Sequence, residues 1–259
     1  MILRRLGNKK KLAEHIQTYF PDHSIYVEPF FGAGGMFFNK PKVKYNIVND
    51  LDSDVFNLFQ IVSNNYTELE TKFKTMPIHS DLFEYWKENE ETDDVMKALR
   101  FLFLSNLTFV NTIVYGASRC NGNQFLKLID LIEPTNKYLF GVQFMNKDFK
   151  VFFDSISLDD RGGKGETNKT FIYCDPPYLG TNDNYSDSFN EEKSLLLFDT
   201  LEDTSCKWAM SEFDHPFIIK QAEERGLNII IIGERRNIKN RRTEILVTNY
   251  ENRQGSLFT

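Results

Sequence analysis

The chain has 259 residues, 41% of them hydrophobic, which suffices for one substantial core and a second, smaller lobe. Its formal net charge of −6 argues mildly against a nucleic-acid partner, because DNA phosphates repel an acidic surface. No signal-peptide pattern is visible, the apolar runs are too short to span a bilayer, and the three scattered cysteines lack a matching set of histidines, so we expect a cytoplasmic protein without a membrane segment or a metal site.

The first fifty residues predict the opening of a doubly wound α/β sheet. Apolar residues at helical spacing predict a helix over Lys9–Phe20, and the next apolar segment, Ile25–Phe30, is a predicted strand. This strand runs directly into the glycine turn Phe31–Gly35, and a second strand, Tyr45–Val48, ends next to Asp50. Strand, glycine turn and strand in this order are typical of nucleotide-binding α/β folds.

The middle of the chain changes character at about residue 52. Helical periodicity with many charged residues continues to about residue 104 without a convincing strand, which predicts a helical insert. Residues 115–125 are rich in Gly, Asn and Ser and predict an exposed turn or hairpin tip, while 159–168 form a polar loop. Between them, Val142–Met145 is a candidate strand of the main sheet.

The α/β pattern returns after residue 170. The predicted elements are strands at Phe171–Cys174 and Lys207–Met210, helices at Glu191–Leu201 and Phe217–Arg225, and closing strands at Asn228–Ile232 and Glu244–Thr248. A short basic loop joins the last two strands, and a connection of that kind favours an antiparallel pair over a crossover.

The strongest chemical signal is Asp175-Pro176-Pro177-Tyr178, hereafter the strip, which directly follows a predicted apolar strand. Open α/β sheets place their ligand crevice at this end of a strand. The prolines stiffen the backbone, and the Asp175 carboxylate beside an exposed carbonyl can accept both hydrogens of a planar amino group. Tyr178 supplies a ring on which a base can stack. The strip therefore predicts methylation of a ring-attached amine, and the alternative is a plain surface turn.

The glycine turn and Asp50 predict a nucleotide site. Glycines permit positive φ and let a ligand approach the backbone, and Asp50 stands where an acidic side chain binds ribose hydroxyls in such folds. The glycines match a dinucleotide motif only approximately, so NAD and a nucleoside without pyrophosphate both stay open. Gly7-Asn8-Lys9 offers a site for a small anion at the start of the first helix, and its alternative is an ordinary capped helix.

Two stretches carry basic residues and no acidic ones. They are formed by Arg4, Arg5, Lys9, Lys10 and Lys11 near the start, and by Arg235, Arg236, Lys239, Arg241 and Arg242 near the end. Each stretch is either a solvated face or a contact with DNA.

Four motifs follow one another along the chain: Leu6-Gly7-Asn8-Lys9, Val27-Glu28-Pro29-Phe30-Phe31-Gly32-Ala33-Gly34, Asn49-Asp50 and Tyr173-Cys174-Asp175-Pro176-Pro177-Tyr178. In this order they resemble the Dam family of DNA adenine methyltransferases. The resemblance runs through Asn190, and Thr243–Asn249 resembles the family's closing strand. It implies an α/β fold, a doubly wound mixed sheet of the S-adenosylmethionine-dependent methyltransferase type with an inserted, mostly helical recognition domain. It also implies methyl transfer from S-adenosylmethionine to the exocyclic amino group of adenine in double-stranded DNA, with base flipping.

The resemblance also assigns roles to residues. Asp175, Pro176, Pro177 and Tyr178 would be catalytic, with Asp175 orienting the amino group and no metal required. Cofactor contacts would come from Gly7, Asn8, Lys9, Phe30, Phe31, Gly32, Ala33, Gly34, Asp50 and Asp175. Asp148 and Phe149 resemble the segment that meets the adenine ring of the cofactor, and an equal alternative for Asp148 is a plain helix N-cap.

The implied catalytic domain comprises residues 1–51 and 141–259, and the implied DNA target-recognition domain comprises residues 52–140. Contacts with DNA are expected from Lys9, Arg119, Asn121, Gly122, Tyr185, Ser188, Phe189, Arg235, Arg236 and Arg241. Residues 111–125 match the GATC-reading run of the family only loosely, so the target sequence stays open.

Three alternatives stay open beside this function: methylation of RNA adenine, methylation of a protein glutamine amide, and an inactive DNA-binding relative. Glutamine and some RNA methylating enzymes of similar fold carry Asn before Pro-Pro-Tyr, so Asp175 favours DNA. The intact strip, glycine turn and Asp50 argue against an inactive relative. The sequence does not indicate a restriction endonuclease partner, a bacterial or phage host, or an oligomeric state.

Overall fold

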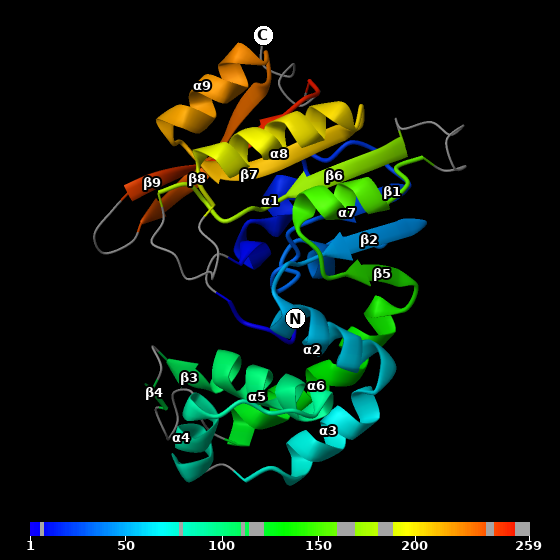
Figure 1. The fold of residues 1–259 in the computed structure, drawn as a ribbon, viewed down its shortest axis with the longest axis vertical. Helices are drawn as coiled ribbons and strands as arrows, with labels where there is room; N and C mark the ends of the chain where they lie inside the picture. Colours follow the sequence, from blue (N-terminus) through cyan, green and yellow to red (C-terminus); the bar gives the residue numbers. More distant parts are fainter. Residues whose placement is uncertain are drawn as a thin grey trace.

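A seven-stranded mixed sheet forms the upper half of the protein in Figure 1. The computed structural model describes residues 1–5, 8–77, 80–109, 112–113, 122–159, 169–180, 189–236 and 241–251. The strands are β1 (Ile25–Glu28), β2 (Tyr45–Asn49), β5 (Val142–Met145), β6 (Thr170–Cys174), β7 (Lys207–Phe213), β8 (Asn228–Arg236) and β9 (Arg241–Thr248). Their order is β5-β2-β1-β6-β7-β9-β8. The predicted α/β class and the antiparallel closing pair are confirmed, because β9 runs antiparallel to both β7 and β8.

The sheet reverses its strand order between β1 and β6. β1 pairs in parallel with β2 on one side and with β6 on the other, where Val27 lies opposite Ile172. β1 and β6 are buried at every position, as expected for parallel strands covered on both faces. Ligands of open α/β sheets bind where the strand order reverses, at the carboxyl ends of the strands. The glycine turn and the strip are the segments that leave these two ends.

Helices cover both faces of the sheet. On one face lie α7 (Phe149–Ser155), α8 (Glu191–Asp203) and α9 (Pro216–Glu224), which are drawn in front of the strands in Figure 1. The short 3₁₀ helix η1 (Lys9–Lys11) and α1 (Ala13–Gln17) belong to the other face. The alternation of β1 explains this division, because Val27 packs with the core around α7 and α8 whereas Tyr26 packs with the core around α1.

Five helices and a small hairpin form the lower half of Figure 1. They are α2 (Ser53–Asn64), α3 (Tyr66–Thr75), α4 (Ser80–Glu88), α5 (Asp94–Leu107), α6 (Gly122–Leu139), and the strands β3 (Thr108–Phe109) and β4 (Thr112–Ile113). Their apolar side chains join the core on the α1 face of the sheet, since the rings of Phe59 on α2 and Phe31 in the glycine turn lie 5.0 Å apart between centroids. None of the helices in the described ranges is long and apolar enough to cross a bilayer.

Two local predictions need correction. The predicted helix Lys9–Phe20 is divided into η1 and α1, because its first turn is a 3₁₀ turn in which the N–H of Leu12 binds the carbonyl of Lys9. The predicted turn at 115–125 ends in a helix, since α6 begins at Gly122, and its apolar residues at helical spacing, such as Phe125 and Ile129, are buried. Residues 114–121, and 160–168 of the predicted polar loop, lie outside the described residues.

Candidate active site

The strip leaves the carboxyl end of β6 and meets Lys9 from η1. Lys9 Nζ lies 2.8 Å from Asp175 Oδ1, and the Lys9 side chain is only 2% exposed. The Asp175 side chain keeps 21% of its surface exposed, so a ligand can reach it. Asn8 caps η1 by accepting the N–H of Lys10, which fixes the turn that directs Lys9 inward. The capped-helix interpretation is therefore confirmed for Asn8.

A second carboxylate, Glu244 on β9, completes the cluster. Glu244 is fully buried, and its Oε1 lies 3.3 Å from Lys9 Nζ. The same oxygen accepts the hydroxyl of Tyr178 at 3.1 Å. Lys9 thus lies between two carboxylates, and Tyr178 connects the strip to β9. We call Lys9, Asp175, Tyr178 and Glu244 the strip cluster.

The ring of Tyr178 already has neighbours on the protein. Lys9 Nζ lies 4.5 Å from its centroid, a cation–π contact. The Phe213 ring of β7 packs against it in an edge-to-face arrangement, with centroids 4.6 Å apart. Arg242 lies over Phe213 and donates to the carbonyl of Gly180 at 2.7 Å. These contacts hold the end of the strip against β7 and β9.

Burial dominates the electrostatics of the acidic groups here. Desolvation raises the pKa of Asp175, and the Lys9 ammonium opposes this shift. Desolvation also raises the pKa of Glu28, at the end of β1, to about 8, and that of Glu212, on β7, to about 9. Both are influenced by the Asp175 charge, which raises their pKa values further. The carboxyl ends of β1, β6 and β7 thus bring three acidic groups close together.

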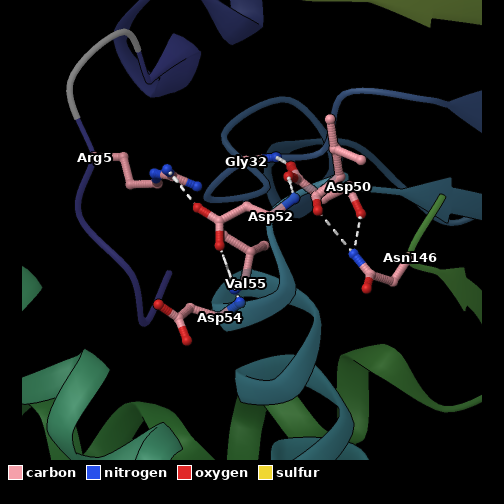
Figure 2. A network of polar contacts seen from close by, with 8 residues as sticks. Arg5, Gly32, Asp50, Asp52, Asp54, Val55 and Asn146 are labelled. Carbon is pink, nitrogen blue, oxygen red and sulfur yellow. Dashed lines mark hydrogen bonds and ion pairs between the residues drawn. The ribbon is translucent and has the colours of Figure 1, made fainter. Parts of the chain in front are cut away.

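The glycine turn is held by Asp50. Gly32 and Gly34 adopt positive φ values of 53° and 70°, which glycine tolerates without steric cost. Figure 2 shows that Asp50 accepts the N–H of Gly32 through Oδ2, and Oδ1 accepts the N–H of Asp52 at 2.9 Å. Asp50 therefore joins the ends of β1 and β2, as a residue beside a ligand crevice would.

The same network continues to the start of α2 (Figure 2). Asp52 caps that helix by accepting the N–H groups of Asp54 and Val55. Its Oδ2 also forms an ion pair with the Arg5 guanidinium, at 2.8 Å. Asn146 donates to the carbonyls of Asp50 and Leu51. This network thereby connects four segments at one place: the N-terminal segment, the glycine turn, α2 and the end of β5.

Three phenylalanines gather beside the glycine turn. Phe30 lies 5.7 Å from Phe149 and 6.0 Å from Phe189 between ring centroids, and Phe149 and Phe189 are 6.2 Å apart. They come from the segment between β1 and the glycine turn, the start of α7 and the segment before α8. Asp148 caps α7 by accepting the N–H of Lys150, which confirms the helix N-cap that we gave as the alternative for this residue. Phe149 belongs to the buried core, and the partly buried Phe30 and Phe189 pack against it.

These residues fit a nucleoside cofactor. At Gly32, which has a positive φ, an added Cβ would meet nothing within 4 Å, so a ligand can approach the backbone there. At Gly35 an added Cβ would come within 2.2 Å of Asn8 Oδ1, so the turn packs directly on the cap of η1. Within the described ranges, no three His, Cys, Asp or Glu side chains are placed to hold a metal ion.

The predicted DNA contacts are only partly described. Lys9 is buried, so it does not belong to an exposed basic patch, and Arg5 is paired with Asp52. Gly122 begins α6, Phe189 lies in the phenylalanine cluster, and the backbones of Arg235, Arg236 and Arg241 form the facing ends of β8 and β9. Arg119, Asn121, Tyr185 and Ser188 lie outside the described residues, as does Gly7, which was predicted as a cofactor contact.

Sequence reasoning missed three buried acids of the site: Glu28, Glu212 and Glu244. Glu28 accepts the hydroxyl of Tyr26 at 2.7 Å. Each lies within or at the end of an apolar strand, and an acidic residue in such a position is rare unless it is paired. That signal was present in the sequence and could have identified them.

Comparison with known proteins agrees with this geometry. The family model of D12 class N6 adenine-specific DNA methyltransferases matches residues 6–248. The chain is 26% identical to the type II methyltransferase M1.LlaDCHI of Lactococcus lactis subsp. cremoris, over 95% of this chain and 94% of the relative. It is 26% identical to a DNA adenine methylase of Vibrio cholerae, over 88% and 79%. It is 25% identical to the DNA adenine methylase of Escherichia coli (strain K12), over 68% and 64%. The chain therefore belongs to the D12 class N6 adenine-specific DNA methyltransferase family.

Proposed function

We propose that the protein uses S-adenosylmethionine to methylate an adenine that is flipped out of double-stranded DNA and held at the strip. Membership of the family makes the protein an adenine-specific DNA methyltransferase. The cofactor, the flipping step and the residue roles belong to the proposal. The observation that carries them is the partly exposed Asp175 carboxylate, held by buried Lys9 where the strand order reverses. A base inside a duplex cannot reach a carboxylate in such a crevice unless it leaves the stack.

The glycine turn and the phenylalanine cluster would hold the cofactor. When bound, S-adenosylmethionine supplies an electrophilic methyl group on a sulfonium centre. The partly buried Phe30 would offer aromatic surface to its adenine ring, supported by the buried ring of Phe149 beside it. Each Asp50 oxygen already accepts one N–H but has a further lone pair for a ribose hydroxyl. Gly7, Asn8, Lys9 and residues 30–34 would surround the remainder, with Asp148 stabilising the start of α7.

Asp175 would orient the target amino group. Its carboxylate and the carbonyls of the proline pair accept the two N–H groups, which directs the nitrogen lone pair toward the incoming methyl group. The amine gives up its proton after the new N–C bond has formed, so Asp175 acts by orientation and charge before it acts as a proton acceptor. Tyr178 would provide the ring beside the base.

The helical insert and the two hairpins would contact DNA. We assign residues 1–51 and 141–259 to catalysis and residues 52–140 to target recognition. The hairpins β3–β4 and β8–β9 lie on the same side of the molecule, at the left of Figure 1. Arg235, Arg236 and Arg241 on β8 and β9 would bind phosphates, and Arg119, Asn121 and Gly122 would contact bases or phosphates. Tyr185, Ser188 and Phe189 would lie near the extruded base.

Incubation with labelled S-adenosylmethionine and duplex DNA, followed by nucleoside digestion and sequencing of modified sites, tests the proposal. We expect label in N6-methyladenine at one short sequence, with single-stranded DNA and RNA labelled more slowly. Label in RNA alone, or in another base, would contradict it. An inert wild-type protein that still binds DNA would indicate an inactive relative.

A further inference from the structure

We propose that Glu244 is a positioning residue for methyl transfer: its buried carboxylate fixes Lys9 and Tyr178, and through them the acceptor group of Asp175. This inference rests on the proposed role of the strip. Glu244 lies 66 residues after Tyr178 in the chain, yet its Oε1 accepts the Tyr178 hydroxyl and lies 3.3 Å from Lys9 Nζ.

The position of Glu244 in the sheet makes it a rigid support. On β9 it lies opposite Phe213 of β7, and the Phe213 ring packs on Tyr178. On the other side it lies opposite Gly233 of β8, next to a register shift between Ile231 and Gly233. A side chain on a paired central strand is fixed more firmly than one on a loop, and the strip is a loop. Glu244 therefore connects the strip to a strand that is paired on both sides.

Lys9 explains why a second carboxylate is needed. If Asp175 were its only carboxylate partner in the strip cluster, the Lys9 ammonium would stay on Asp175 Oδ1 and would compete with the target amine for that acceptor. Glu244 gives Lys9 an alternative partner 3.3 Å away, against 2.8 Å to Asp175. Lys9 can then move toward Glu244 when an amino group approaches Asp175. Burying an ion pair contributes little to stability, so its presence favours a role in the site.

Three charged or polar groups influence the ionisation of Asp175: Lys9 from η1, Glu244 from β9 and Tyr178 from the strip. The charge of Asp175 in turn raises the pKa values of the groups that face it from the neighbouring strands, which are Tyr173 and Cys174 on β6, Glu28 on β1 and Glu212 on β7. Glu244 raises the pKa of Asp175 and Lys9 lowers it. Removing either charge should therefore shift the acidic limb of the pH–rate profile in opposite directions.

The test compares Glu244→Gln with Lys9→Met and with Glu234→Gln. Glutamine keeps an acceptor for Tyr178 but removes the charge, and Glu234 provides the same substitution at an exposed position of the same β8–β9 hairpin. Folding is checked by circular dichroism and cofactor affinity by calorimetry. We expect Glu244→Gln to bind S-adenosylmethionine nearly as wild type does, but to lose about tenfold or more in kcat, with its acidic limb at lower pH. Lys9→Met should move the limb to higher pH, and Glu234→Gln should change neither quantity.

A double-mutant cycle separates positioning from general loss of stability. Tyr178→Phe removes the hydroxyl that Glu244 accepts, and Glu244→Ala removes the acceptor, so the double variant Tyr178→Phe with Glu244→Ala should lose less than the product of the two single losses in kcat. Fully multiplicative losses, or acidic limbs that do not move in opposite directions in the folded variants, would overturn the inference. An inactive wild type would instead contradict the proposed function, and an active wild type with unaltered Glu244→Gln would contradict only the role of Glu244.

Discussion

Glu212 Oε1 accepts the backbone N–H of Leu179 at 3.1 Å, which ties β7 to the residue that directly follows the strip. The same oxygen accepts the N–H of Phe213 at 3.0 Å, so one atom joins both segments. Desolvation by burial raises the pKa of this carboxyl to about 9. Glu212 therefore keeps its proton at neutral pH in the folded protein and loses it when the chain unfolds.

This shift predicts a pH dependence of stability. Between the unfolded pKa, near 4.5, and the folded value of about 9, the folded state binds one proton more than the unfolded state, so the free energy of unfolding falls as pH rises. One such group gives a slope of up to about 1.4 kcal/mol per pH unit. Glu212→Gln, which resembles the neutral acid, should flatten that slope in urea titrations from pH 5 to 9. An equal slope in wild type and variant would contradict the raised pKa.

Glycines with positive φ offer a matched pair for the cofactor site. Gly32 (φ 53°) and Gly141 (φ 76°) both have nothing within 4 Å of an added Cβ, so alanine at either position introduces backbone strain of about 1 kcal/mol and no clash. Gly32→Ala places its methyl group in the proposed cofactor space, whereas Gly141 lies before β5. We expect similar losses of thermal stability in both variants. Only Gly32→Ala should weaken S-adenosylmethionine binding in calorimetry by about tenfold or more, and equal affinities would place the cofactor elsewhere.

Substitution of Asp175 separates orientation from binding. Asp175→Ala removes the acceptor of the target amine and leaves Phe30, Phe149 and Asp50 in place, so methyl transfer should be abolished while cofactor affinity is largely kept. Asp175→Asn, which keeps one acceptor oxygen but not the charge, should retain more activity than alanine if hydrogen-bond geometry contributes. Single-turnover assays with labelled cofactor measure both variants. Full activity of Asp175→Ala would disprove the role of the strip.

Most of the sheet could be predicted from the sequence because its strands are short apolar runs next to glycine or proline. Val142–Met145 was identified as β5 from four residues alone, and the antiparallel order of the last two strands followed from their short connection. The boundaries were less accurate: β8 continues to Arg236, beyond the apolar run, because pairing with β9 and not hydrophobicity sets its end. The long helix α6 was missed since its start is rich in glycine and asparagine and Pro134 interrupts its interior.

The site was predictable where chemistry lies in contiguous motifs and not where it depends on tertiary pairing. The strip and the glycine turn are contiguous, and the reversal of strand order between β1 and β6 brings them together. Lys9 was assigned to a basic patch because the charge of neighbouring residues in the sequence does not show which way a side chain points. In the structure it is buried and pairs with Glu244, more than two hundred residues away in the chain. A single acidic residue inside an apolar strand is the sequence feature that indicates a buried partner of this kind.

The basic ends of β8 and β9 predict a salt-dependent DNA contact. The backbone register places Arg235 opposite Arg242 and Arg236 opposite Arg241, so four arginines of the sequence belong to the facing ends of these strands. Neutralising one phosphate-binding arginine should lower the slope of log K against log[salt] by about one unit. We therefore expect a shallower slope for Arg236→Gln in fluorescence-anisotropy titrations of duplex DNA. Lys220→Gln, at a 68% exposed position on α9, is the matched control and should keep the wild-type slope. Equal slopes in all three proteins would mean that this hairpin is a solvated surface that does not touch the phosphates.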